Sequence, residues 1–221
     1  MEKKLIIWDF DGVIADTEKI WLYHRMITLN KDYGLNFNEE TIRQKFWGMS
    51  DQTKKELLKN MGIETDDAFW RKNNQLDEDF IRQKGFELTE GIADIFKLSH
   101  IKQCIATGTI RGKIFIKIKV AGIEKYFSDQ NVFTADMVAC GKPEPDLFLL
   151  ACEKMGEDPK NTIVVEDSIA GLKAAIRAGC LPVAFTKYTP RGDSHYFKEL
   201  ERLKILNVFD DMFQLKKFIE A

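Results

Sequence analysis

Short apolar runs recur along this chain and are separated by longer amphipathic segments. The runs cover residues 5–8, 103–106, 131–133, 162–165 and 181–185, with a weaker one at 205–208. Continuous apolar runs of this length are typical of strands that are buried on both faces of a parallel sheet. Since parallel strands need crossover connections, usually helices, the alternation predicts an α/β fold whose parallel sheet is covered on both faces.

Two of the intervening segments carry clear helix boundaries. Pro145 fits a first helical turn, and Gly156 is placed to end the helix that follows. In the other segment the periodicity predicts that Ile169, Leu172 and Ile176 share one face, with Gly179 closing the helix.

The region 16–87 interrupts the alternation. It is rich in Lys, Glu, Asp and Asn, and its periodic pieces are helical, the first being a predicted stripe of Ile20, Tyr23 and Ile27. We therefore expect an all-helical cap inserted into a discontinuous α/β core. The expected boundaries are 1–15 and 88–221 for the core and 16–87 for the cap.

Composition excludes several function classes. The chain has 33 basic and 35 acidic residues, a net charge of −2, which argues against a nucleic-acid-binding surface. The longest stretch without Asp, Glu, Lys or Arg, 178–186, is far shorter than the ~20 apolar residues of a membrane span. Four cysteines without metal-ligand spacing are typical of free thiols, so we expect a cytoplasmic protein.

Two closely spaced acids follow the first predicted strand, in Asp9-Phe10-Asp11-Gly12. The carboxyl ends of parallel strands are where α/β proteins bind ligands. Carboxylates this close repel each other, and Mg²⁺ would relieve that repulsion. The alternative interpretation is an ordinary Asp- and Gly-rich turn.

A second pair of acids, Glu166-Asp167, follows another predicted strand and precedes Ser168. The alternative here is a helix N-cap, which is compatible with a metal-binding role. Together, the two pairs would bring four carboxylates to one edge of the sheet.

Two further segments complete the set. Thr107-Gly108 follows a strand and offers a hydroxyl and backbone N–H groups to an oxyanion. Lys142, between Gly141 and Pro143, can direct a positive charge at the same edge. Acids, a lysine, a hydroxyl and N–H groups suit a phosphoryl group with Mg²⁺.

These motifs, in this order, resemble those of the haloacid dehalogenase-like hydrolases, in particular the β-phosphoglucomutase-like phosphatases with a helical cap. The resemblance extends to the stretch 164–171 and covers essentially the whole chain. It implies a Rossmann-like core and an Mg²⁺-dependent phosphomonoester hydrolase that acts through an aspartyl-phosphate, with sugar phosphates as the expected substrates.

The resemblance also implies roles for individual residues. Asp9 would be the nucleophile and Asp11 the acid and base. The phosphate would be bound by Thr107, Lys142 and the backbone N–H groups of Phe10 and Gly108. The metal would be held by Asp9, the Asp11 carbonyl and Asp167, with Glu166 acting directly or through water.

The main alternative is a β-phosphoglucomutase-type sugar phosphomutase. Mutase-like relatives carry an Arg near the position of Asp51 and a His near that of Trp21, so the hydrolase is favoured.

Residues predicted to set specificity in the cap are Trp47, Gly48, Met49, Ser50 and Lys72. For Trp47 the alternative is a place in the cap core, and for Lys72 a solvated helix face. We expect a small-molecule phosphate ester as ligand, neither nucleic acid nor membrane as partner, and a monomer by default.

Overall fold

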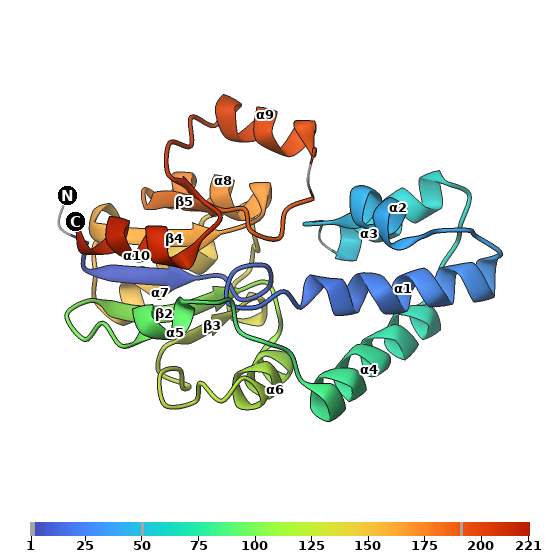
Figure 1. Ribbon diagram of the computed structural model, residues 1–221, viewed down its shortest axis with the longest axis horizontal. Coiled ribbons are helices and arrows are strands. Elements are labelled where there is room, and N and C mark those ends of the chain that lie inside the picture. The colour runs from blue at the N-terminus through green and yellow to red at the C-terminus, as the bar shows by residue number, and fades with distance from the viewer. Residues whose placement is uncertain (1–2, 50, 191) are drawn as a thin grey trace. The chain divides into compact units, whose positions relative to one another are not determined.

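The computed structural model describes residues 3–49, 51–190 and 192–221, and the chain divides into two compact units. The sheet unit comprises Met1–Asp16, Phe86–Thr189 and Ser194–Ala221. The helical unit comprises Thr17–Gly85 and Pro190–Asp193. The expected α/β class, with a parallel sheet and a separate all-helical insertion, is confirmed (Figure 1).

The sheet has six parallel strands in the order β3-β2-β1-β4-β5-β6. Their bounds are β1 Leu5–Trp8, β2 Lys102–Thr107, β3 Val132–Thr134, β4 Thr162–Glu166, β5 Leu181–Phe185 and β6 Val208–Phe209. In the central register, Trp8 of β1 lies beside Ile105 of β2 and Val165 of β4. The strand order runs outward from β1 to β3 on one side and from β4 to β6 on the other, so the switch point of the sheet lies between β1 and β4.

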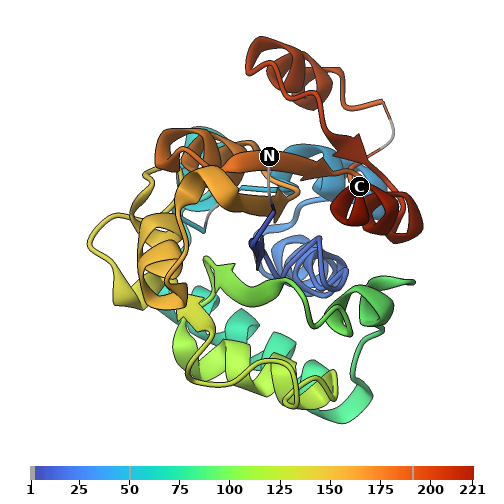
Figure 2. The same cartoon turned by 90° about the vertical axis from the view of Figure 1, so that its left-hand side faces the viewer.

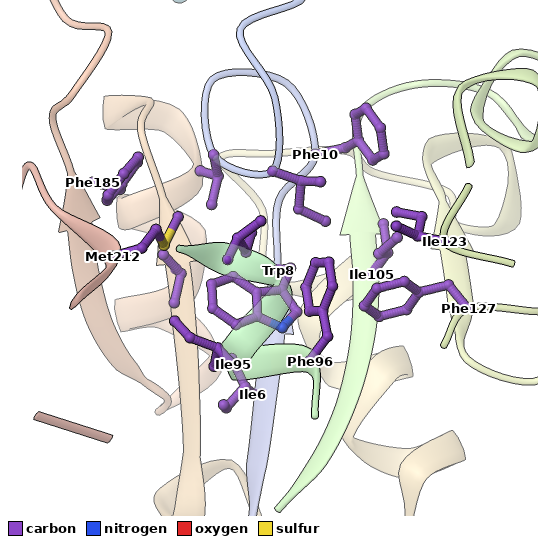
Figure 3. Close-up of a cluster of buried hydrophobic side chains, with 14 of the residues drawn as sticks. Ile6, Trp8, Phe10, Ile95, Phe96, Ile105, Ile123, Phe127, Phe185 and Met212 are labelled. Atoms are coloured by element: carbon purple, nitrogen blue, oxygen red, sulfur yellow. The ribbon is translucent and has the colours of Figure 1, made fainter. Parts of the chain in front are cut away.

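Alternate side chains of the buried strands feed two separate cores, one on each face. Ile6 and Trp8 belong to the larger core, in which Trp8 packs edge-on against Phe96 with ring centroids 5.9 Å apart (Figure 3). Leu5 and Ile7 belong to the core on the opposite face. All four β1 side chains are fully buried, which explains the continuous apolar run in the sequence.

Helices cover both faces of the sheet (Figure 2). The larger core receives α5 Ile92–Phe96, α6 Arg111–Val120 and α10 Met212–Glu220. The opposite core receives α7 Asp146–Met155 and α8 Ile169–Ala178, while α9 Ser194–Arg202 packs in a smaller cluster. As expected, Gly156 and Gly179 end α7 and α8 in the left-handed conformation.

Two sequence expectations for the sheet unit were wrong in detail. The sixth strand begins at Val208 instead of Ile205, because Ile205 follows a turn at Lys204 and packs against α9. In α8, Ile176 is 41% exposed, and the buried positions include Ala174, Ala175 and Ala178. Leu172 of the predicted face is fully buried and Ile169 packs against its cluster, so apolar periodicity found part of the buried side of α8 and missed the small residues that complete it.

The helical unit consists of four helices in its described residues. They are α1 Glu18–Tyr33, α2 Glu39–Phe46, α3 Asp51–Asn60 and α4 Asp67–Lys84. The predicted stripe on α1 is only partly buried: Ile20 is buried, but Tyr23 and Ile27 are exposed. The buried side of α1 includes Arg25, which no apolar pattern reveals. In the described part of the chain, no helix has the length and apolarity needed to span a membrane.

Candidate active site

The candidate site lies in the sheet unit, at the carboxyl ends of the three adjacent strands β1, β2 and β4. Asp9 directly follows β1, Thr107 ends β2, and Glu166 ends β4. Acids that are far apart in the sequence therefore lie together at the switch point of the sheet. This is the place where α/β proteins bind their ligands.

The loop after β1 is folded tightly against β4. The Asp9 N–H donates to the Val165 carbonyl at 3.0 Å, and the Phe10 carbonyl accepts from Ile14 N–H at 2.9 Å. Gly12 has φ of +80°, and a Cβ at this position would lie 2.1 Å from Oδ2 of Asp167. Only glycine leaves room for the Asp167 carboxylate beside the loop, so the two acid pairs of the sequence meet here.

Lys142 joins the acids of β1 and β4. Its Nζ donates to Oδ1 of Asp9 at 2.6 Å, to Oε1 of Glu166 at 2.5 Å and to the Ala106 carbonyl at 3.2 Å. The Lys142 side chain is 11% exposed and lies in the connection between β3 and α7. A charge-assisted contact to each of two buried carboxylates fixes the position of the ammonium group.

Both oxygens of Glu166 are engaged. While Oε1 accepts from Lys142, Oε2 accepts from the backbone N–H and the hydroxyl of Ser168, each at 2.8 Å. A Cβ on Gly171 would lie 2.0 Å from the Glu166 carboxyl carbon, so α8 begins close against this carboxylate. The N-cap interpretation holds for Ser168, whose side chain accepts from Gly171 N–H at 3.0 Å.

The site carries more acids than cations, and this affects ionisation. Burial raises the pKa of Asp9 to about 7, helped by Glu166 and Asp11 and opposed by Lys142. Burial lowers the pKa of Lys142, but the charges of Asp9 and Glu166 outweigh it and leave that pKa raised. Lys142 is therefore a permanent cation, and a further positive charge beside Asp9 would keep Asp9 ionised.

The donor set suits a hard divalent cation. Among the described residues, no three His, Cys, Asp or Glu side chains form a ready-made metal cluster. The set expected here is different: carboxylates of Asp9 and Asp167 with a main-chain carbonyl, and Mg²⁺ commonly keeps several waters with one or two carboxylates. The space that Gly12 leaves for the Asp167 carboxylate supports this fit.

Asp11 is held by two residues that the sequence did not single out as site residues. Its Oδ2 accepts from the Thr109 hydroxyl at 2.9 Å, and its Oδ1 lies 2.5 Å from Nζ of Lys117. The signal for Lys117 was present, because a lysine there lies next to Ile118 and three residues after Ile114, both buried on α6. A cation so placed needs a buried partner.

The predicted phosphate-binding residues fall at the same edge of the sheet. Thr107 is 1% exposed and its Oγ1 accepts from the Thr109 N–H at 3.1 Å, while Gly108 next to it is exposed. The Phe10 ring belongs to the larger core (Figure 3). It packs edge-on against Phe86, with the ring centroids 6.0 Å apart. The Phe10 backbone, whose N–H group was predicted to bind phosphate, lies in the loop between the two aspartates.

Four of the five residues predicted for cap specificity are described, and all four lie in the helical unit. Trp47 packs against the buried core of that unit, with the Arg43 guanidinium 4.1 Å from its ring centre. Gly48 is exposed and Met49 partly so, and Ser50 lies outside the described residues. Lys72 is half exposed and pairs with Asp32 at 2.9 Å.

Comparison with known proteins decides the family. The family model of the haloacid dehalogenase-like hydrolases matches residues 6–185, a span that includes all four motifs. This chain belongs to that family. The resemblance stated from the motifs is therefore confirmed, and with it the class of enzyme, a phosphatase-type hydrolase.

Relatives of the haloacid dehalogenase-like chain cover most of its length. The phosphorylated carbohydrates phosphatase of Thermotoga maritima is 29% identical over 181 residues, 79% of this chain and 81% of the relative. Protein CbbY of Rhodobacter capsulatus is 30% identical over 216 residues, 87% of this chain and 89% of the relative. A haloacid dehalogenase-like protein of unknown function from Agrobacterium tumefaciens superposes with a TM-score of 0.83 at 25% identity, covering 99% and 98% of the two chains.

Proposed function

We propose that this haloacid dehalogenase-like protein is an Mg²⁺-dependent phosphatase that hydrolyses small phosphorylated carbohydrates through a phosphoryl group carried on Asp9. The observation that carries the proposal is the convergence of Asp9, Lys142 and Asp167 at the switch point of the sheet. It joins a nucleophile, a fixed cation and a second carboxylate within one buried group.

In the first half-reaction, an Asp9 oxygen attacks phosphorus and the bond to the ester oxygen breaks. Asp11 gives its proton to that oxygen, and the alcohol leaves. In the second half-reaction, water attacks the phosphoryl group on Asp9 while Asp11 takes up a proton from the water. Inorganic phosphate and free Asp9 result, so atoms and protons balance over the cycle.

The remaining residues neutralise and orient. Lys142 offsets the negative charge that accumulates when a carboxylate meets a phosphate dianion, and Thr107 with the N–H groups of Phe10 and Gly108 binds phosphoryl oxygens. Bound Mg²⁺, held by Asp9, Asp167 and the Asp11 carbonyl, would supply further charge neutralisation. We assign Glu166 to holding Lys142 and the start of α8, because both its oxygens are engaged.

The substrate class is supported by the relatives. The T. maritima protein is named for phosphorylated carbohydrates, and it matches four fifths of this chain. We infer a cytoplasmic location from the four cysteines, which are free thiols in the structure, because a reducing compartment maintains thiols.

The test is phosphate release from a panel of sugar phosphates, polyol phosphates and nucleotides, with Mg²⁺ and with excess EDTA. We expect release from several sugar phosphates, loss of turnover in EDTA, and a loss of at least ~10³-fold in Asp9→Asn with an unchanged melting temperature. Mg²⁺ should also raise the melting temperature of the wild type more than that of Asp167→Asn, because an ion that binds only the folded state stabilises it.

Phosphate release that persists in EDTA, or in Asp9→Asn, would overturn the proposal. The panel should include β-glucose 1-phosphate with glucose 6-phosphate followed in the same samples. Isomerisation without net phosphate release would establish the mutase alternative in place of hydrolysis.

A further inference from the structure

Lys117 is a nearly buried cation of α6 for which the proposed mechanism has no role so far. Its side chain is 13% exposed, its Nζ lies 2.5 Å from Oδ1 of Asp11 and 5.6 Å from the centre of the Phe10 ring. Taking a lysine out of water is costly unless a partner compensates it. The partner is an acid 106 positions away in the sequence, on the loop after β1.

Asp11 is thereby held at both carboxylate oxygens from one side. Thr109 donates to Oδ2 and Lys117 to Oδ1, and both belong to the segment that runs from the end of β2 into α6. A carboxylate held by one oxygen can rotate about its side-chain bonds, whereas two contacts from one rigid segment fix its orientation. Each aspartate of the loop thus contacts a lysine, Lys142 for Asp9 and Lys117 for Asp11, and Lys142 also contacts Glu166.

We propose that Lys117 is a positioning residue that holds the Asp11 carboxyl group where it exchanges protons with the leaving oxygen and with the attacking water. This inference rests on the proposed phosphatase function. Lys117 itself forms no bond in the reaction, and the proton still passes between Asp11 and the oxygen atoms. Its removal should therefore slow the proton-transfer steps and leave the binding of the phosphoryl group intact.

The experiment compares Lys117→Met with Lys119→Met, an exposed lysine of the same helix. Each is assayed for kcat and KM on an alkyl phosphate accepted by the wild type, for inhibition by inorganic phosphate, and for the first-turnover burst with p-nitrophenyl phosphate. We expect kcat of Lys117→Met on the alkyl phosphate to fall ~10- to 100-fold, in the range of general acid–base catalysis. KM and the inhibition constant for phosphate should change less than ~3-fold, because Lys142 and not Lys117 binds the phosphoryl oxygens.

The aryl burst separates positioning from a structural role. p-Nitrophenolate leaves without needing a proton, so the burst should slow far less than alkyl phosphate turnover. A merely structural role would slow both alike. Lys119→Met should match the wild type in every assay.

Two further variants serve if Lys117→Met does not fold. Thr109→Val removes the other contact to Asp11 with little change in shape and should give the same pattern more weakly, and Lys117→Arg should recover part of the activity. An unchanged kcat in Lys117→Met would overturn the proposal. A raised KM and a raised inhibition constant for phosphate, with kcat intact, would also overturn it, because Lys117 would then be a substrate-binding group. If the wild type releases no phosphate from any substrate, the proposed function fails and this inference falls with it; normal turnover in Lys117→Met makes only this inference fail.

Discussion

Buried charges are arranged differently in the two units. In the sheet unit, the ends of β1 and β4 bring four acids to a single place, and Lys142 contacts two of them, Asp9 and Glu166. Four acids share two lysines there, which leaves an excess of negative charge in a buried setting. Such an excess is costly by itself, and a bound cation would offset it.

In the helical unit, the two cations that are buried among the described residues each pair with an acid. Arg25, 1% exposed, pairs with Asp77, and Lys54 pairs with Glu18 at 3.0 Å. Both cations also lie over the ring of Trp21, with Nζ of Lys54 3.6 Å from the ring centre. These contacts join α1 to α3 and α4. One-to-one ion pairs of a cation with an acid therefore link helices in the helical unit. A group with more acids than cations, as in the sheet unit, indicates a binding site for a further ligand.

The largest expected difference in activity between the two units is seen by replacing one lysine in each. Lys142→Met should lower kcat by ~10²- to 10³-fold, because it removes a fixed cation from the reacting group. Lys72→Met, at an exposed lysine paired with Asp32, should change kcat and KM less than ~3-fold. Steady-state kinetics on one sugar phosphate measures both. A tenfold rise in KM for Lys72→Met would break the comparison, since the helical unit would then supply a charge to the substrate.

A smaller effect is expected from two helix glycines of the sheet unit. In Gly171→Ala the new methyl group must displace the Glu166 carboxylate, which releases Lys142 and should lower kcat by about tenfold or more. In Gly112→Ala of α6, the methyl group meets nothing within 4 Å. That control should keep full activity and gain up to ~1 kcal/mol in free energy of unfolding from helix propensity. Equal activity of the two variants would show that the Glu166–Lys142 contact does not matter for turnover.

The smallest effect on activity, and a clear one on stability, is expected in the helical unit. Asp77→Asn leaves Arg25 without its acid and should lower the free energy of unfolding by about 2 kcal/mol, while kcat changes less than ~3-fold. Asp79→Asn, which removes the charge from an exposed contact with Gln75 on the same helix, should stay within ~0.5 kcal/mol of the wild type. Denaturant unfolding measures both. A large loss of turnover in folded Asp77→Asn would contradict a purely structural pairing.

The sequence was most informative where the backbone alone determines position. Side chains at the carboxyl ends of parallel strands lie at one edge of the sheet. The proximity of Asp9, Thr107 and Glu166 could therefore be predicted from the positions of the strands in the sequence. Lys117 could not be assigned to Asp11 in this way, because nothing in the sequence fixes how α6 lies over the loop after β1. Only its place beside buried isoleucines pointed to a partner.

The helical unit was predicted less well for a related reason. The buried side of α1 contains Leu22, Arg25 and Leu29, and a pattern search that looks for apolar residues rejects a face with an arginine in it. Tyr23 and Ile27 were chosen instead and are exposed. Ion pairs between helices depend on tertiary packing, so they leave no periodic signal in the sequence.

The most direct test of the account is to trap the phosphoryl group on the enzyme. Asp11→Asn is mixed with p-nitrophenyl phosphate and Mg²⁺, because an aryl leaving group departs without a proton while the second half-reaction still needs Asp11. The sample is quenched in acid and its peptides are analysed by mass spectrometry. The account predicts one phosphoryl group on the peptide that contains Asp9, and none in the Asp9→Asn, Asp11→Asn double variant. A phosphoryl group on another residue, or none at all while the wild type releases phosphate, would contradict it.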